Sequence, residues 1–194
     1  MGRTKVYNQD GFQSAAWKEF SEWLPNEIKS LASELYTSKF IEIEIDHIKE
    51  KQVRFEVKKS LQLGNIEGIN HTTGQGAGID FTTEFMGYDN LRQNTWENSN
   101  MVTKETNQEK GKRFTAYIAG DPNAINCQDK ADVIAAMENM QIRCRNDPLL
   151  RTLGESIKVN VHTKKGGEIR TYNAIEVAEM VDLATAAALG VNMD

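Results

Sequence analysis

The residues best suited to chemistry lie between Lys39 and Leu61, in the sequence KFIEIEIDHIKEKQVRFEVKKSL. Apolar and charged residues alternate there in two stretches, a pattern typical of two β-strands joined by a turn. Successive side chains of a strand point to opposite faces, so one face of this hairpin would be charged. Its members are Glu42, Glu44, Asp46, Arg54, Glu56 and Lys58. Such a face can be a solvated ladder of ion pairs, or carboxylates that hold Mg²⁺ beside a lysine.

The spacing of three of these residues resembles a known motif. Asp46, nine intervening residues and then the sequence Glu-Val-Lys ending at Lys58 resemble the active site of the PD-(D/E)xK nuclease family. The resemblance covers residues 25–60. It implies a Mg²⁺-dependent nuclease in which Asp46 and Glu56 hold the metal ion, which activates a water molecule, and Lys58 orients the attacking species.

The solvated ladder is the interpretation that the sequence favours. Glu42 and Glu44 extend the charged face and Arg54 joins it, as expected where opposite charges pair across exposed strands. Active strands of the nuclease family are apolar on both faces, whereas these strands alternate. We therefore predict a protein that is not an enzyme, with no catalytic residues, no metal and no cofactor. The nuclease with Asp46, Glu56 and Lys58 is kept as the alternative.

The elements before the hairpin follow from apolar spacing. Apolar residues recur every three or four positions from Trp17 to Leu35, which predicts a helix with one buried stripe. Pro25 interrupts this stripe and has no N–H for a helix interior, so we predict two helices, over residues 12–23 and 25–37. We expect them to pack on the apolar face of the hairpin.

Residues 64–112 are rich in Gly, Asn, Thr and Gln and show no regular periodicity. A segment of this length is far longer than the usual connection within a compact domain. Phe85, Tyr88 and Trp96 stand in this polar segment, and large aromatic side chains are typical anchors of protein interfaces. We predict an extended arm or long loop that contacts other subunits through these three residues. Folding back on its own domain and stacking on nucleic acid are the alternatives.

The last third of the chain is regular again. We predict a strand over residues 113–119, a helix over 128–145 and a hairpin over 157–172. Asn173 followed by Glu176 is typical of a capping box, and predicts the start of a final helix that ends near Gly190.

These elements predict the α+β fold class. The order is an N-terminal helix with a β-hairpin, a long polar arm, and then strand, helix, hairpin and helix. We divide the chain into a helix-hairpin part of the core, an arm and a C-terminal α+β part of the core, over residues 1–63, 64–112 and 113–194.

Composition limits the function further. The chain has 194 residues, 39% of them apolar, enough for one core-bearing domain. Its net charge of −5 argues against unspecific binding of nucleic-acid backbones. No apolar run approaches the ~20 residues that span a bilayer, and residues 1–10 do not resemble a secretion signal. Cys144 continues the helical stripe of Met137 and Met140, so we expect a buried thiol.

The resulting hypothesis is a structural or interaction subunit of a multi-subunit assembly. Virion, phage neck and phage tail components are assemblies of this style, and the analogy is one of organisation. The predicted partners are protein subunits, identical or different, with nucleic acid and membrane not expected. The predicted location is the cytoplasm, or a particle assembled there.

Overall fold

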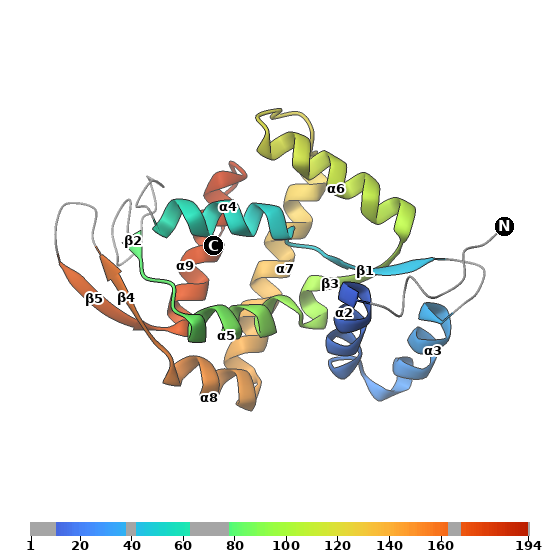
Figure 1. Ribbon diagram of the computed structural model, residues 1–194, viewed down its shortest axis with the longest axis horizontal. Helices are drawn as coiled ribbons and strands as arrows, with labels where there is room; N and C mark the ends of the chain where they lie inside the picture. The colour runs from blue at the N-terminus through green and yellow to red at the C-terminus, as the bar shows by residue number, and fades with distance from the viewer. Residues whose placement is uncertain (1–10, 38–41, 63–77, 163–167, 194) are drawn as a thin grey trace.

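The structure, a computed structural model, describes residues 11–37, 42–62, 78–162 and 168–193 (Figure 1). Within these ranges the chain is mainly helical and also contains two small antiparallel sheets. The α+β class predicted from the sequence is therefore confirmed. None of the helices in these ranges is both long enough and apolar enough to cross a bilayer.

Two short helices begin the described chain, as the apolar spacing predicts. α2 spans Gly11–Glu22 and α3 spans Asn26–Tyr36. Pro25 lies between them in an extended conformation, with φ −56° and ψ 143°. Because proline at this position does not need to donate a backbone hydrogen bond, α3 can begin at the next residue. The predicted break is confirmed.

The first strand is present, but its partner is not the predicted one. β1 (Ile43–His47) pairs antiparallel with β3 (Ser99–Thr103), and Ile45 lies opposite Met101. The segment predicted as the second strand of the hairpin is the helix α4 (Lys51–Gln62). The prediction of an N-terminal hairpin is therefore wrong.

Burial explains why α4 is a helix. Val53, Val57 and Leu61 are four residues apart, so they form one helical face, and all three are buried. This face packs on α9 (Ala174–Ala188). Phe55, which the strand pattern would place beside Val53 and Val57, is 49% exposed. The segment has both a two-residue and a four-residue apolar spacing, and packing on α9 selects the helix.

The polar middle of the chain is not an extended arm where the structure describes it. It contains α5 (Thr83–Gln93), the 3-10 helix η1 (Trp96–Asn98), β3 and α6 (Lys104–Ile118). The arm prediction is wrong for residues 78–112, and residues 64–77 lie outside the described residues. α6 also includes residues 113–118, so the prediction of a strand over residues 113–119 is wrong as well.

Threonine side chains begin both of these helices. Thr82 accepts a hydrogen bond from the backbone N–H of Phe85, and Thr103 accepts one from Thr106. Such N-caps satisfy donors that the first helical turn leaves unpaired. Two helices can therefore begin in a segment that has little apolar periodicity.

The last third contains α7 (Cys127–Asn146), α8 (Pro148–Ser156), β4 (Lys158–His162), β5 (Ile169–Asn173) and α9. The predicted helix, hairpin and final helix are confirmed. α9 begins with the predicted capping box, in which the side chains of Asn173 and Glu176 each accept the other residue's backbone N–H. Cys144 is buried in α7, as expected.

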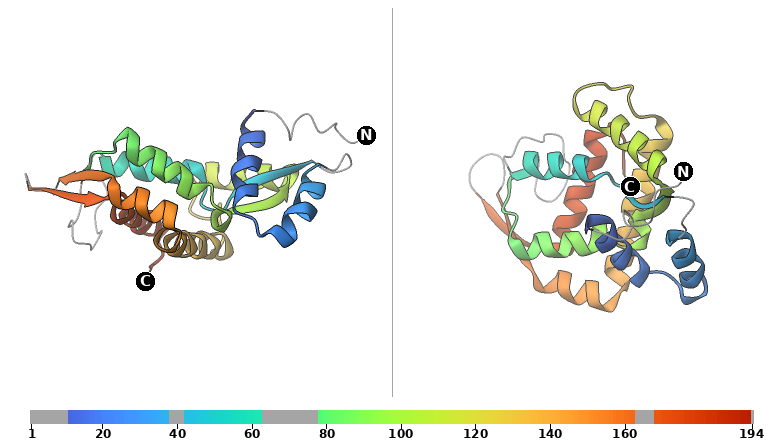
Figure 2. Two further views of the ribbon diagram at one scale, coloured as in Figure 1. Left: turned by 90° about the horizontal axis from the view of Figure 1, so that it is seen from below. Right: turned by 45° about the vertical axis from the view of Figure 1, so that its right-hand side comes forward.

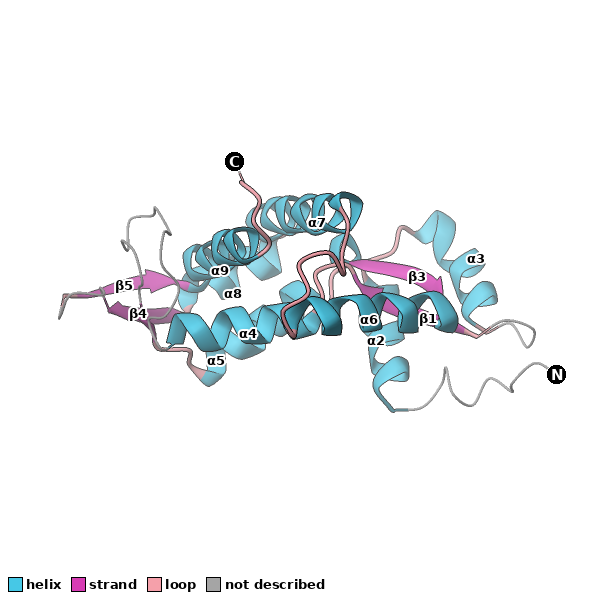
Figure 3. Cartoon of the chain, turned by 90° about the horizontal axis from the view of Figure 1, so that it is seen from above, coloured by secondary structure: helices cyan, strands magenta, loops and turns pink. Residues whose placement is uncertain are grey.

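The helices form two layers, with α4, α5 and α6 on one side and α7, α8 and α9 on the other (Figure 3). The sheets lie at opposite ends of an elongated molecule (Figures 1 and 2). β1 and β3 lie with α2 and α3 at one end, and the other end holds β4 between β2 (Gly78–Ile79) and β5. One core cluster includes Val57, Phe85 and Val181, so all three predicted parts of the chain contribute to it.

Gly154 permits the close contact between α8 and α9. A Cβ atom at this position would lie 2.5 Å from Cγ1 of Ile175 and 3.0 Å from Cε2 of Tyr88. We expect Gly154→Ala to lower the free energy of unfolding, measured in urea, by about 1–2 kcal/mol, because overpacking outweighs the gain in helix propensity.

Gly87→Ala is the matched control, because Gly87 is also helical and a Cβ there would meet no atom within 4 Å. This variant should be more stable than the wild type by about 0.5–1 kcal/mol. Equal changes in the two alanine variants would contradict the packing argument.

Candidate functional site

A network of buried charges lies between the two helical layers, and Asp182 of α9 is one of its centres. Its carboxylate accepts a hydrogen bond from Nζ of Lys49 at 3.0 Å and one from Nε2 of Gln141 at 2.9 Å. Both terminal nitrogens of the Arg92 guanidinium also donate to it. The side chains of Lys49 and Asp182 are fully buried and that of Arg92 is 1% exposed, so water does not screen these pairs.

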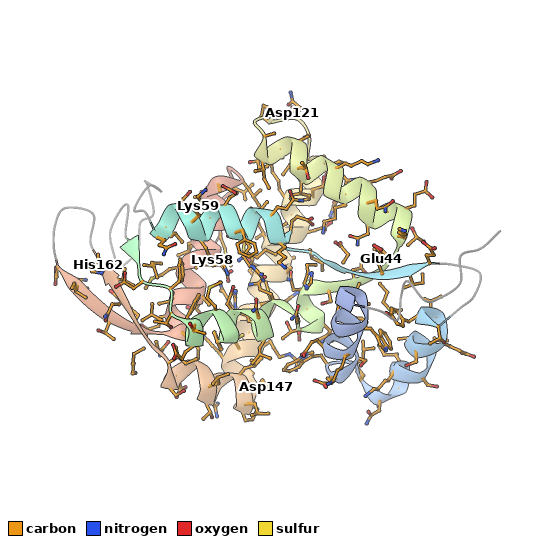
Figure 4. The ribbon with its side chains drawn as sticks, in the orientation of Figure 1. Glu44, Lys58, Lys59, Asp121, Asp147 and His162 are labelled. Carbon is orange, nitrogen blue, oxygen red and sulfur yellow. The ribbon has the colours of Figure 1, made fainter. Side chains whose placement is uncertain are left out.

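Asp89 of α5 is the second centre. It accepts a hydrogen bond from Nζ of Lys58 at 2.8 Å and one from Nε2 of Gln93 at 3.3 Å. Arg54 approaches with its Nε at 3.9 Å. Lys58 lies between α4 and α5 (Figure 4). Burial alone would raise the pKa of Asp89, but the surrounding cations, Lys58 first, outweigh it and lower this pKa to about 2.

The network is not electrically balanced. Within the described chain it joins four buried cationic side chains to two carboxylates, those of Asp89 and Asp182. Burial is the largest cause that lowers the pKa of Lys49, Arg54 and Lys58. These groups therefore favour any further negative charge that can reach them.

A small cavity opens on the cationic side of this network. Its volume is about 210 Å³, and its lining consists of His47, Lys49, Lys51, Arg54, Asn90 and Asn94. These residues come from the end of β1, the connection to α4, the start of α4, and the second half and C-cap of α5. None of the described residues that line it is acidic.

The acidic face of β1 is neutralised by α6, not by a second strand. Lys104 lies 3.6 Å from Glu42, Asn107 donates to Glu44 at 2.9 Å, and Lys110 donates to Asp46 at 2.7 Å. Glu44 and Asp46 are 3% and 8% exposed. The predicted solvated ladder is therefore wrong: Glu42 and Asp46 pair with lysines of α6, Glu44 accepts from the uncharged Asn107, and Glu44 and Asp46 are buried.

The structure does not assemble the nuclease motif. Asp46 is bonded to Lys110, and Lys58 is bonded to Asp89 in the core. Glu56 and Lys58 lie on a helix, where two positions correspond to about 200° of rotation, so Glu56 is exposed while Lys58 is buried. No cluster of three His, Cys, Asp or Glu residues suited to a metal ion occurs in the part of the chain that the structure describes.

Two of the three predicted interface aromatics lie in the core of their own chain. Phe85 is 0% exposed and Tyr88 is 1% exposed, which corresponds to the alternative that this segment folds back on its own domain. The prediction that Phe85 and Tyr88 contact other subunits is corrected, because both are core residues. Trp96 is 37% exposed beside an open groove of about 620 Å³ that also includes Ile142 and Pro148. Its role at an interface stays a prediction.

The apolar stripe that the sequence predicts to be buried is exposed on α3, so that part of the prediction is wrong. Ile28, Leu31 and Leu35 are 42%, 67% and 44% exposed, and their spacing of three and four residues puts them on one face. Tyr36, on another side of the helix, is buried and stacks on Trp17 with ring centroids 4.6 Å apart. α3 is thus held to the protein by one side while an apolar stripe faces solvent.

The buried network also was not predicted, although the sequence carries traces of it. Asp182 is the only charged residue between Glu179 and the end of α9, in the apolar sequence MVDLATAAA. A single acid in such a segment indicates a buried, paired carboxylate. Its partners are far away in sequence, and periodicity cannot identify them.

Comparison with protein-family models, with curated proteins and with solved structures gives no match for this chain. The function therefore has to be inferred from the geometry and chemistry of the structure. They define an α+β protein with an ionic core, a small cationic cavity and an exposed apolar helix face.

Proposed function

We propose that the protein is a non-enzymatic subunit of a multi-subunit assembly and that it docks on another protein through the apolar stripe of α3. The stripe, Ile28, Leu31 and Leu35, is the observation that carries this proposal. A surface helix normally turns its apolar stripe toward its own core. A helix that leaves such a stripe in water is typical of a surface that a partner covers.

The arrangement of α3 supports docking rather than local disorder of the stripe. Pro25 starts the helix, and the backbone N–H of Thr37 bonds the carbonyl of Ser33 at its end. Tyr36 and its stacking contact with Trp17 fix one side of the helix to α2. A helix held in this way presents three apolar side chains at defined positions, which reduces the conformational entropy lost on binding.

The charged residues beside the stripe of α3 indicate which kind of partner can bind there. Glu27 and Glu34 are four residues before and three residues after Leu31, so both border the stripe on the same side. Two copies of α3 packed antiparallel would bring these glutamates together, which is unfavourable. The partner that we propose is a different subunit with an apolar groove and Lys or Arg along its edge. As in the sequence analysis, we propose a virion, a phage neck or a phage tail as the assembly, and the cytoplasm as the location.

The replacement Leu31→Glu tests this function. It places a charge at the most exposed position of the stripe, so a partner would have to bury an unpaired carboxylate. We expect binding to weaken at least about 100-fold, since burial of one leucine contributes ~1.5–3 kcal/mol and an unpaired charge costs more. The measurement is size-exclusion chromatography with light scattering on the chain alone and co-expressed with proteins encoded beside it.

Ser30→Glu is the matched control, because it adds the same charge to the same helix away from the stripe. A complex that survives Ser30→Glu and dissociates with Leu31→Glu supports the proposal. A wild-type chain that is monomeric with every co-expressed neighbour, or a complex insensitive to both variants, would overturn it.

A further inference from the structure

The cavity at the start of α4 has the chemistry of an anion site. Its lining includes the cationic residues Lys51 and Arg54, the amides of Asn90 and Asn94, and Lys49, whose ammonium group is bonded to Asp182. The Asn94 Oδ1 atom contacts Nε2 of His47 at 2.7 Å, which leaves the Asn94 NH₂ group to donate elsewhere. Such a set can donate several hydrogen bonds to one bound oxyanion.

Arg54, which lines the cavity, has one guanidinium donor that the described residues do not satisfy. Its side chain is 7% exposed, and its Nε has no hydrogen-bond partner among the described residues. The nearest carboxylate, Asp89, is 3.9 Å away and is already bonded to Lys58. A buried guanidinium donor without an acceptor is costly, so an anion in this cavity would remove a penalty as well as add an interaction.

The first turn of α4 adds to the positive potential. Lys51 is the first residue of the helix, no acidic side chain lies in its first turn, and Glu50 just before it is paired with Lys110 at 3.6 Å. Backbone N–H groups at a helix N-terminus have no intrahelical acceptors and carry the positive end of the helix dipole. Phosphate-bearing ligands commonly bind at this end of a helix.

We propose that this cavity binds one small oxyanion, inorganic phosphate or the phosphate group of a small metabolite, between the start of α4 and the second half of α5. The anion accepts hydrogen bonds from Arg54, Lys51 and Asn90. It also balances part of the excess positive charge of the buried network.

Size and net charge restrict the ligand to a small one. The volume of about 210 Å³ is below the ~300 Å³ at which pockets for drug-sized ligands begin. A whole-chain charge of −5 opposes the approach of a polyanion such as DNA or RNA. The inference does not depend on docking through α3, because the cavity is formed by other elements.

The test is binding of inorganic phosphate to the full chain, measured by calorimetry and by thermal unfolding at constant ionic strength. At a phosphate concentration about 100 times Kd, we expect the Tm to rise by about 5–10 °C. Sulfate and adenosine monophosphate form two further arms, which separate a free tetrahedral anion from a phosphate carried by a metabolite. A short DNA oligonucleotide forms the last arm.

Two exposed lining residues allow variants that keep the fold. Lys51→Gln removes one cationic donor, and Asn90→Asp places a carboxylate in the lining. We expect at least about tenfold weaker phosphate binding for each, since a hydrogen bond to a charged group contributes ~1.5–3 kcal/mol. Lys59→Gln is the control, because Lys59 is an exposed lysine of α4 outside the lining (Figure 4).

Phosphate binding that is weakened by Lys51→Gln and Asn90→Asp, and unchanged by Lys59→Gln, supports the site. The proposal is overturned if no phosphate, sulfate or nucleotide raises the Tm. It is also overturned if the oligonucleotide binds more tightly than phosphate, or if Lys59→Gln weakens binding as much as Lys51→Gln does.

Discussion

Asp182→Asn is expected to lower the free energy of unfolding at pH 7 by about 3–5 kcal/mol, because it leaves buried cations without their counter-charge. The asparagine keeps the size of the side chain but replaces one carboxylate oxygen by an NH₂ group. Every neighbour that bonds this carboxylate, namely Lys49, Arg92 and Gln141, is a donor. The new NH₂ group would therefore face the donors of Lys49 and Arg92, and only Gln141, after a flip of its amide, could offer it an acceptor. Urea denaturation at neutral pH measures the effect.

A variant that removes the whole ion group separates charge from packing. Replacing Asp182 by Leu together with Lys49→Met and Arg92→Met leaves no buried charge unpaired at this centre. Since apolar replacement of a complete buried ion group is often neutral, we expect this triple variant to recover most of the lost stability. If Asp182→Asn alone is as stable as the wild type, the ionic pairs described for Asp182 do not exist in solution.

Asp89→Asn is expected to cost about 3 kcal/mol at pH 7, and its effect should depend on pH. Lys58 and the other cations lower the pKa of Asp89 to about 2, below the value of an unfolded aspartate. The folded protein therefore gains stability from Asp89 above the unfolded pKa and loses it as the pH falls toward 2. A pKa shift of this size corresponds to about 2 kcal/mol in the free energy of unfolding.

The measurement is the difference in unfolding free energy between wild type and Asp89→Asn from pH 7 to pH 2. We expect this difference to shrink by about 2 kcal/mol, and most of the change to occur below pH 4. Glu56→Gln, at an exposed position of α4, is the control and should change stability by less than about 0.5 kcal/mol. A difference that is independent of pH would show that folding does not shift the pKa of Asp89, and a difference that grows as the pH falls would show that Asp89 is not ionised in the folded protein.

The sequence predicted those elements whose signals are local. Pro25 marks the break between α2 and α3, and Asn173 with Glu176 marks the start of α9. The hairpin of β4 and β5 has alternating residues on both sides of a short connection, and it is formed as predicted. In each case the residues that determine the structure are only a few positions apart.

The errors occur where distant residues decide the structure. The alternating pattern predicts a neighbouring strand as the partner of β1, whereas its partner in the structure, β3, begins more than fifty residues later. The alternation in α4 predicts a strand because Val53 and Val57 satisfy both spacings, and only packing on the surface of α9 selects the helix. The same limit applies to the charged residues. The sequence predicts Lys58 in a solvated ladder or, as the alternative, in a nuclease site, whereas its carboxylate partner, Asp89, lies in the segment predicted as an arm.

The connection between Lys49 and Asp182 spans 133 residues and has a consequence for biosynthesis. Both Lys49 and Arg92 emerge from the ribosome long before α9 has been translated. During that interval the nascent chain has two cations that cannot enter the interior, so this core forms only after α9 has left the ribosome. Products of premature termination before α9 should therefore be substrates for proteolysis rather than folded fragments.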